Sequence, residues 1–204
     1  MVYYLIIIYK EAAMDYKIVK SEDFVVNQWS GGNTTQFVIY PEDSTLSKRD
    51  FDWRISSASF TTSSSQFSDF SGYQRYLLPL QGELFVEHEN LYKRTLFPYD
   101  VEYFYGKWTT KSNNSLDCID FNFIVREDLQ ANLAILKEDD LYAPKKKGKL
   151  ILYSKENSII QISETEESTI NLDAESLFII EEEEILNCIK IIQCSSPVII
   201  CEVN

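Results

Sequence analysis

The sequence has one histidine, His88, in 204 residues, and its cysteines include no CxxC pair. A structural zinc site takes four ligands, mostly from cysteine and histidine, so this chain offers too few suitable ligands for one. His88 itself lies in the charged stretch Glu87-His88-Glu89-Asn90, which is typical of an exposed hairpin. We therefore expect an exposed His88, no bound metal and no cofactor.

Two other sequence signals of familiar chemistry are also missing. There is no serine nucleophile elbow and no glycine-rich phosphate loop. The four cysteines fall in apolar, strand-like surroundings, which favours reduced, buried thiols of a cytosolic protein. They are Cys118, Cys188, Cys194 and Cys201.

Basic residues are scarce: 19 lysines and arginines face 32 aspartates and glutamates, for a net charge of -13. This balance argues against a nucleic-acid partner and against docking on an anionic membrane. Long apolar runs are missing too, because the apolar start at residues 2–9 is shorter than the roughly 20 residues that span a bilayer. That start lacks the features of a signal peptide, and Met14 is an alternative initiator. We expect a cytoplasmic protein whose residues 1–13 are an extension, either disordered or adding an edge strand.

What the chain does contain is a dense series of short β-type runs, with 45% hydrophobic and 14% aromatic residues. Their regular spacing and the scarcity of 3.6-residue periodicity predict an all-β barrel or jelly roll. The first lobe ends near residue 126. Residues 127–143 fit one short helix or a further strand pair, and residues 150–203 fit further short strands.

Two predicted strands carry polar side chains on one face. In residues 51–58, alternation separates Phe51, Trp53 and Ile55 from a face that carries Arg54. Residues 119–126 place apolar side chains on one face and Asp120, Asn122 and Arg126 on the other. The polar face of the second strand meets either solvent or a lined cavity. An inward Arg54 would need a partner, which could be a ligand.

The arginines allow two interpretations. In so acidic a chain, arginines gathered at one site create a local positive field suited to bidentate capture of a carboxylate. Alternatively, Arg54, Arg75 and Arg126 pair internally as structural elements. Their partners would then be Asp52, Asp69 and Asp120.

Four ordered motifs across residues 28–126 resemble the HutD/Ves family. They are Trp29-Ser30-Gly31-Gly32-Asn33-Thr34-Thr35-Gln36, Phe51-Asp52-Trp53-Arg54-Ile55-Ser56-Ser57-Ala58, Phe67-Ser68 through Gly72-Tyr73-Gln74-Arg75, and Asp120-Phe121-Asn122-Phe123-Ile124-Val125-Arg126. The resemblance implies a cupin-superfamily, RmlC-like jelly roll with two β-barrel lobes in one bicupin-like unit. Residues 14–126 would form the first lobe and 127–204 the second, packed compactly. Ser30 departs from the family pattern, where many members carry a basic residue after the tryptophan, which puts ligand identity or affinity in doubt.

The resemblance also implies a small cytosolic bacterial protein with an accessory or regulatory role in histidine utilisation or stress response. A metal-dependent cupin would use several histidines with a carboxylate, and this chain has only His88. We therefore expect a metal-free pocket for a small anionic metabolite, such as urocanate or formylglutamate. Its predicted ligand-binding residues are Trp29, Gln36, Arg54, Ser56, Arg75 and Asn122.

Two other functions stay open. One is a metal-free enzyme of isomerase or lyase type, acting on a small carboxylate or sugar-like substrate with Asp120 or Glu102 as general base. The other is a protein-interaction module that uses the acidic surface or the N-terminal extension. We favour binding over catalysis, assign no catalytic residue, and leave a homodimer open.

Overall fold

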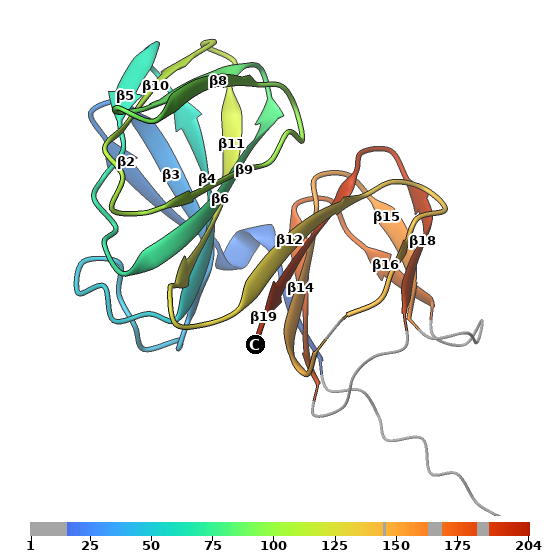
Figure 1. Cartoon of the computed structure of the whole chain (residues 1–204). Coiled ribbons are helices and arrows are strands. Elements are labelled where there is room, and N and C mark those ends of the chain that lie inside the picture. Colours follow the sequence, from blue (N-terminus) through green and yellow to red (C-terminus); the bar gives the residue numbers. More distant parts are fainter. Residues whose placement is uncertain (1–15, 145, 163–168, 183–187) are drawn as a thin grey trace, which may run out of the picture.

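The computed structural model describes residues 16–204 apart from 145, 163–168 and 183–187, and nearly all of its regular structure is β (Figure 1). One 3-10 turn, η1 (Ser21–Asp23), is the exception in this part of the chain. Within the same residues, no helix is long and apolar enough to cross a membrane. The predicted all-β class is confirmed, whereas the expected extension at residues 1–13 lies outside the described residues.

The first lobe is a pair of antiparallel sheets. Six strands form one sheet in the order β2-β3-β4-β11-β6-β9, and four form the other in the order β5-β10-β7-β8. In chain order the strands are β2 (Val25–Trp29), β3 (Gly32–Tyr40), β4 (Trp53–Phe60), β5 (Ser64–Gln66), β6 (Tyr73–Gln81), β7 (Leu84–His88), β8 (Tyr92–Leu96), β9 (Glu102–Tyr105), β10 (Thr110–Asn114) and β11 (Ile119–Arg126).

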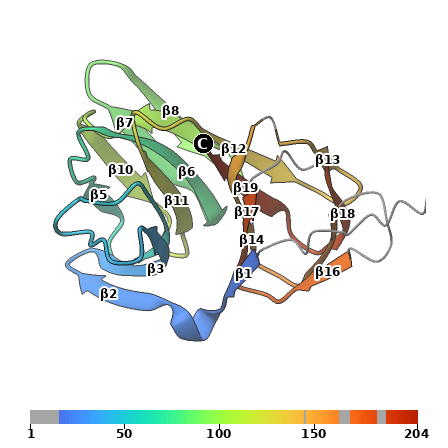
Figure 2. The same ribbon diagram turned by 90° about the horizontal axis from the view of Figure 1, so that it is seen from below.

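The second lobe is also a pair of antiparallel sheets (Figure 2). Its sheets have the orders β1-β17-β14-β19-β12 and β13-β18-β15-β16. The strands are β1 (Tyr16–Val19), β12 (Ala131–Leu136), β13 (Leu141–Tyr142), β14 (Gly148–Ser154), β15 (Ser158–Ile162), β16 (Thr169–Leu172), β17 (Ser176–Glu182), β18 (Ile189–Cys194) and β19 (Val198–Val203). Two facing sheets in each lobe agree with the predicted two-lobed jelly roll.

The chain crosses between the lobes at both ends of the first one. β1 pairs with β17, placing Ile18 opposite Phe178, so residues 16–19 join the sheet of the second lobe although the sequence assigned them to the first. After β11, residues 131–136 and 141–142 form strands rather than the alternative short helix, and β12 pairs with β19.

An apolar core lies between the six-stranded sheet of the first lobe and the five-stranded sheet of the second. The ring of Phe37 on β3 stacks on Tyr153 of β14 with centroids 5.0 Å apart. Trp53 and Ile55 of β4 are buried in the same core. Alternation along β4 therefore turns Arg54 to the opposite face, toward the inside of the first lobe.

The interiors of the two lobes differ. The second lobe is filled by buried leucine, isoleucine, valine and phenylalanine side chains. The first has a smaller apolar cluster built around Leu77, Leu84 and Phe104, and beside it the inner faces of β4 and β11 carry polar groups. A cavity with polar walls therefore lies in the first lobe.

Candidate functional site

A cavity of about 350 Å³ opens inside the first lobe, lined by residues of β2, β3, β4, β5, β6 and β11 and of the loops that precede β4 and β6. Five of the six predicted site residues line it: Trp29, Arg54, Ser56, Arg75 and Asn122. The sixth, Gln36, is not among the lining residues and instead contacts one of them. The tertiary structure thus brings together residues separated by more than 90 positions in the sequence.

Arg54 is held by its neighbours within the sheet and is only 3% exposed. Its Nε donates to Gln36 Oε1 at 2.8 Å, and its Nη1 donates to Ser56 Oγ at 2.8 Å. Nη2 is buried and has no hydrogen-bond partner among the described residues. Burial lowers the pKa of Arg54 to about 10, so the side chain remains charged at neutral pH.

Arg75 approaches the cavity from β6 and is equally buried, at 6% exposure. Its Nη2 donates to Asn122 Oδ1 at 2.7 Å, while its Nε has no partner in the described part of the chain. Its guanidinium carbon lies 4.9 Å from the ring centroid of Phe67 and 5.0 Å from that of Phe104. These rings stabilise the cation by cation–π interaction and exclude water from it. Burial lowers the pKa of Arg75 to about 10.

Asp120 is the main member of the site that the predicted set of ligand-binding residues omitted. It lines the cavity, is 2% exposed, and accepts a hydrogen bond from the Ala58 backbone N–H at 2.9 Å. Burial raises its pKa to about 6, although Ala58, Asn122 and the two cavity arginines each lower it. The alternation that placed Asp120 beside Asn122 was the signal that could have included it in the set.

Trp29 forms part of the wall of the cavity and is 39% exposed. It ends β2, opposite Gly32 at the start of β3, so the predicted glycine turn is a tight hairpin. A Cβ added to Gly31 would lie 2.0 Å from Cζ3 of Trp29, and one added to Gly32 would lie 1.9 Å from the carbonyl oxygen of Ser59. The two glycines are needed because the indole and the neighbouring strand lie directly against them.

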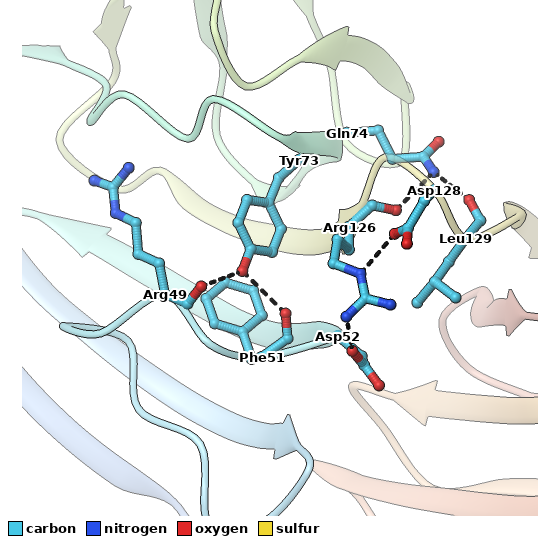
Figure 3. A network of polar contacts seen from close by, with 8 residues as sticks. All are labelled: Arg49, Phe51, Asp52, Tyr73, Gln74, Arg126, Asp128 and Leu129. Carbon is cyan, nitrogen blue, oxygen red and sulfur yellow. Dashed lines mark hydrogen bonds and ion pairs between the residues drawn. The ribbon is translucent and has the colours of Figure 1, made fainter.

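A polar network fixes the segment that leads into β4 (Figure 3). The Tyr73 hydroxyl donates to the carbonyl oxygens of Arg49 at 2.7 Å and Phe51 at 3.0 Å. Arg126 forms ion pairs with Asp52 and Asp128, each at 2.6 Å. These contacts hold the ends of β4, β6 and β11 together, one or two residues from Arg54 and Arg75.

The internal-pairing alternative therefore holds for Arg126 alone. Within the described residues, neither Arg54 nor Arg75 forms an ion pair shorter than 4 Å, and Asp69 accepts hydrogen bonds from Ser71 instead. The two cavity arginines are near Asp120 only at longer range.

The expectation that His88 is exposed is wrong, because His88 is 1% exposed. Its Nδ1 lies 2.8 Å from Thr110 Oγ1, and its Nε2 lies 3.4 Å from Glu102 Oε1. Glu102 also accepts hydrogen bonds from Tyr92 and Arg94. Burial lowers the pKa of His88. Neither His88 nor Glu102 lines the cavity. Glu102 therefore cannot act as a general base on a molecule bound there.

The cavity does not suit a metal cation of the kind that cupin sites hold. Its charged side chains are two guanidiniums and one carboxylate, and guanidiniums repel a cation and cannot ligate it. Among the described residues, no group of three or more histidine, cysteine, aspartate or glutamate side chains is arranged to hold a metal. The arrangement is chemically suited to an anion.

Comparison with solved structures identifies the fold. HutD from Pseudomonas fluorescens SBW25, solved in a formate condition, superposes with a TM-score of 0.75 at 19% identity over 93% of this chain and 98% of that one. A conserved protein of unknown function from Pseudomonas aeruginosa PAO1 gives 0.78 at 21% identity over 93% and 99%. A variant of Bacillus subtilis oxalate decarboxylase gives 0.60 at 7% identity over 91% and 76%.

These similarities confirm the predicted cupin-like, two-lobed β fold. The sequence comparison is more specific, because the HutD family model matches residues 21–194, which include the cavity, its supporting network and most of the second lobe. The chain belongs to the HutD family.

Proposed function

We propose that this protein binds a small anionic metabolite in the cavity of its first lobe and acts as an accessory or regulatory protein rather than as an enzyme. Urocanate and formylglutamate are the metabolites that we propose as candidates, with a cytoplasmic role in histidine utilisation or in a stress response. The binding site is Arg54, Arg75 and Asn122, with Ser56 and Gln36 orienting Arg54 and Trp29 as a wall.

One observation carries this proposal: each of two buried guanidiniums keeps a nitrogen that has no hydrogen-bond partner in the part of the chain that the structure describes. Leaving a buried charged donor unsatisfied costs more free energy than a neutral hydrogen bond returns, so such groups are normally paired. An anionic ligand would supply the missing acceptors at Arg54 Nη2 and Arg75 Nε. Arginine is well suited to this because its planar fork matches a carboxylate.

The charge of the site supports an anionic ligand. Arg54 and Arg75 contribute two positive charges and Asp120 offsets at most one of them, so the cavity has a net positive charge before a ligand enters. The surrounding wall includes Phe60, Phe67 and Phe70, which suits a ligand with a flat or apolar body.

Isothermal titration calorimetry with urocanate, formylglutamate and formate tests the proposal. We expect the wild-type protein to bind at least one of them, and Arg54→Ala and Arg75→Ala to lower its affinity at least about ten-fold. Arg94→Ala is the matched control, because Arg94 bonds Glu102 and the carbonyl oxygen of Val101 and does not line the cavity. Absence of heat with all three compounds, from protein shown to be folded, would contradict the proposal.

A second candidate is a metal-free enzyme of isomerase or lyase type. The observation in its favour is Asp120, a cavity carboxylate whose pKa is raised to about 6, which is the range expected of a general base. Turnover of a small carboxylate or sugar-like substrate that is lost in Asp120→Asn but kept in Asp117→Asn would establish it. Turnover that persists in Asp120→Asn would exclude this mechanism.

A further inference from the structure

The carboxylate of Asp120 shares the cavity with Arg54 and Arg75 and forms no ion pair with either among the described residues. Its described partners are the Ala58 N–H at 2.9 Å and the side chain of Asn122. Asn122 in turn accepts from Arg75 at 2.7 Å. The carboxylate is thus part of the wall that a bound anion would touch, and 2% exposure shields it from water.

The surroundings of Asp120 contain few other groups that titrate. Arg54 faces it from β4 and Arg75 from β6, and both lower its pKa. On its own strand, Asn122 is uncharged, and burial raises the pKa of the nearby Cys118 thiol to about 12, which keeps that group neutral. The remaining polar side chains of the cavity are uncharged: Asn27, Gln28, Thr34, Ser56, Ser65, Gln66 and Ser68.

A ligand carboxylate that bonds both Arg54 and Arg75 enters this enclosed space beside Asp120. The pKa of Asp120 is already raised to about 6 although both arginines lower it. A second carboxylate beside it repels the ionised form and raises this pKa further, so Asp120 takes up a proton when the ligand binds. A carboxylic acid at position 120 can still accept from the Ala58 N–H with one oxygen and donate its O–H to the ligand with the other.

We propose that the site binds its carboxylate ligand together with one proton, held on Asp120, so that Asp120 couples ligand affinity to pH. This inference rests on the proposed function, since it requires an anion at the two arginines. It gives Asp120 a positioning role: its O–H completes the set of donors around the bound carboxylate. The proton comes from solvent and returns there on release.

The coupling fixes the direction of the pH effect. Below about pH 6 Asp120 is already protonated in the free protein, so binding needs no further proton and affinity is highest. Above that pH the proton must be taken from solvent, and affinity falls by up to about ten-fold for each pH unit. Between about pH 5 and about pH 8 we expect at least a ten-fold loss of affinity.

Calorimetry with formate and with formylglutamate tests the inference, because neither probe has a group that titrates in this range. Each titration is run in two buffers with different ionisation enthalpies, so that the difference in heat counts the protons taken up. We expect about one proton per bound anion above pH 7 and about zero near pH 5.

Asp120→Asn is the matched variant, since its amide can accept from the Ala58 N–H and donate to the ligand at any pH. It should bind formate with an affinity that does not change with pH and that equals the wild-type value in acid. Binding by the wild type without proton uptake, or unchanged pH dependence in Asp120→Asn, would overturn the inference while leaving the proposed function intact. No binding by the wild type at any pH would overturn both this inference and the proposed function. If Asp120→Asn fails to fold, the number of protons taken up by the wild type is the test of the inference.

Discussion

The side-chain oxygen of Asn122 accepts a hydrogen bond from Arg75 Nη2 at 2.7 Å, joining β11 to β6 inside the first lobe. This is the one hydrogen bond by which the described structure orients the Arg75 guanidinium. The same amide contributes a hydrogen bond to Asp120. Asn122 therefore links the guanidinium of Arg75 to the carboxylate of Asp120.

Replacing Asn122 with alanine tests this connection. Loss of this bond leaves Nη2 of Arg75 without its acceptor, so we expect urea denaturation to show a free energy of unfolding lower by about 1–3 kcal/mol. Calorimetry should show weaker anion binding. Asn114→Ala is the control, because Asn114 is a buried asparagine of the same lobe that bonds Thr62 and Ser115 and does not line the cavity. Equal loss of anion affinity in both variants would contradict a specific role for Asn122.

Gly31→Ala should displace Trp29, because the new Cβ would lie 2.0 Å from the indole ring. We expect weaker ligand binding together with a change in the fluorescence of Trp29. The control is Gly72→Ala: Gly72 has a φ of +87° and no atom within 4 Å of an added Cβ, so strain costs about 1 kcal/mol but the cavity wall remains. Unchanged affinity in Gly31→Ala would show that Trp29 is not part of the binding site.

Asp120 should make the unliganded protein less stable at neutral pH than in acid. Its pKa is about 6 in the folded protein and 3.8 as the ordinary value, so the folded state favours the protonated form. That contribution is complete below pH 3.8 and is lost as the pH rises through about 6. Asp120→Asn should therefore gain stability relative to wild type as the pH rises, by about 3 kcal/mol at most.

Urea denaturation of both proteins across this pH range measures that difference. Taking the difference between the two proteins removes the other titrating groups. A difference that stays constant with pH, or that decreases as the pH rises, would contradict the burial of an ionisable carboxyl at position 120.

His88 should give the opposite pH dependence. Burial lowers its pKa, so the folded state favours the neutral ring, and the stability that this contributes is present above the ordinary value of 6.5 and lost as the pH falls. We expect the stability advantage of wild type over His88→Gln to shrink as the medium is acidified, as measured by thermal or urea unfolding. An advantage that is constant with pH would indicate that His88 remains accessible to protons in the folded state.

Tyr153→Ala tests the shared core between the lobes. The ring of Tyr153 on β14 stacks on Phe37, and its centroid lies 5.3 Å from the ring centroid of Phe121. Both phenylalanines belong to the first lobe. Removing the ring should cost about 3–5 kcal/mol, with both lobes still unfolding in one transition, whereas Tyr153→Phe should cost much less. Two separate transitions in wild-type calorimetry would show that the lobes are independent.

The strand pattern was readable in the sequence because alternation is a local property. The residues of β4 and β11 alternate with period two, so the faces of Trp53 and of Arg54 could be assigned from their spacing alone. The same rule would have placed His88 inside, since it shares a face of β7 with Leu84 and Val86. The charged neighbours Glu87 and Glu89 obscured that signal and produced the wrong expectation.

The sequence by itself determined the all-β class, the family motifs and the candidate residues of the site. Only the tertiary structure decided that Arg126 pairs with Asp52 while Arg54 and Arg75 form no ion pair among the described residues, and that Asp120 lines the same cavity as these two arginines. The reason is that alternation fixes which face a side chain takes within its own strand. Whether a guanidinium forms an ion pair with a carboxylate depends on the order and register of the strands. Strand order and register are set by contacts between residues far apart in the chain.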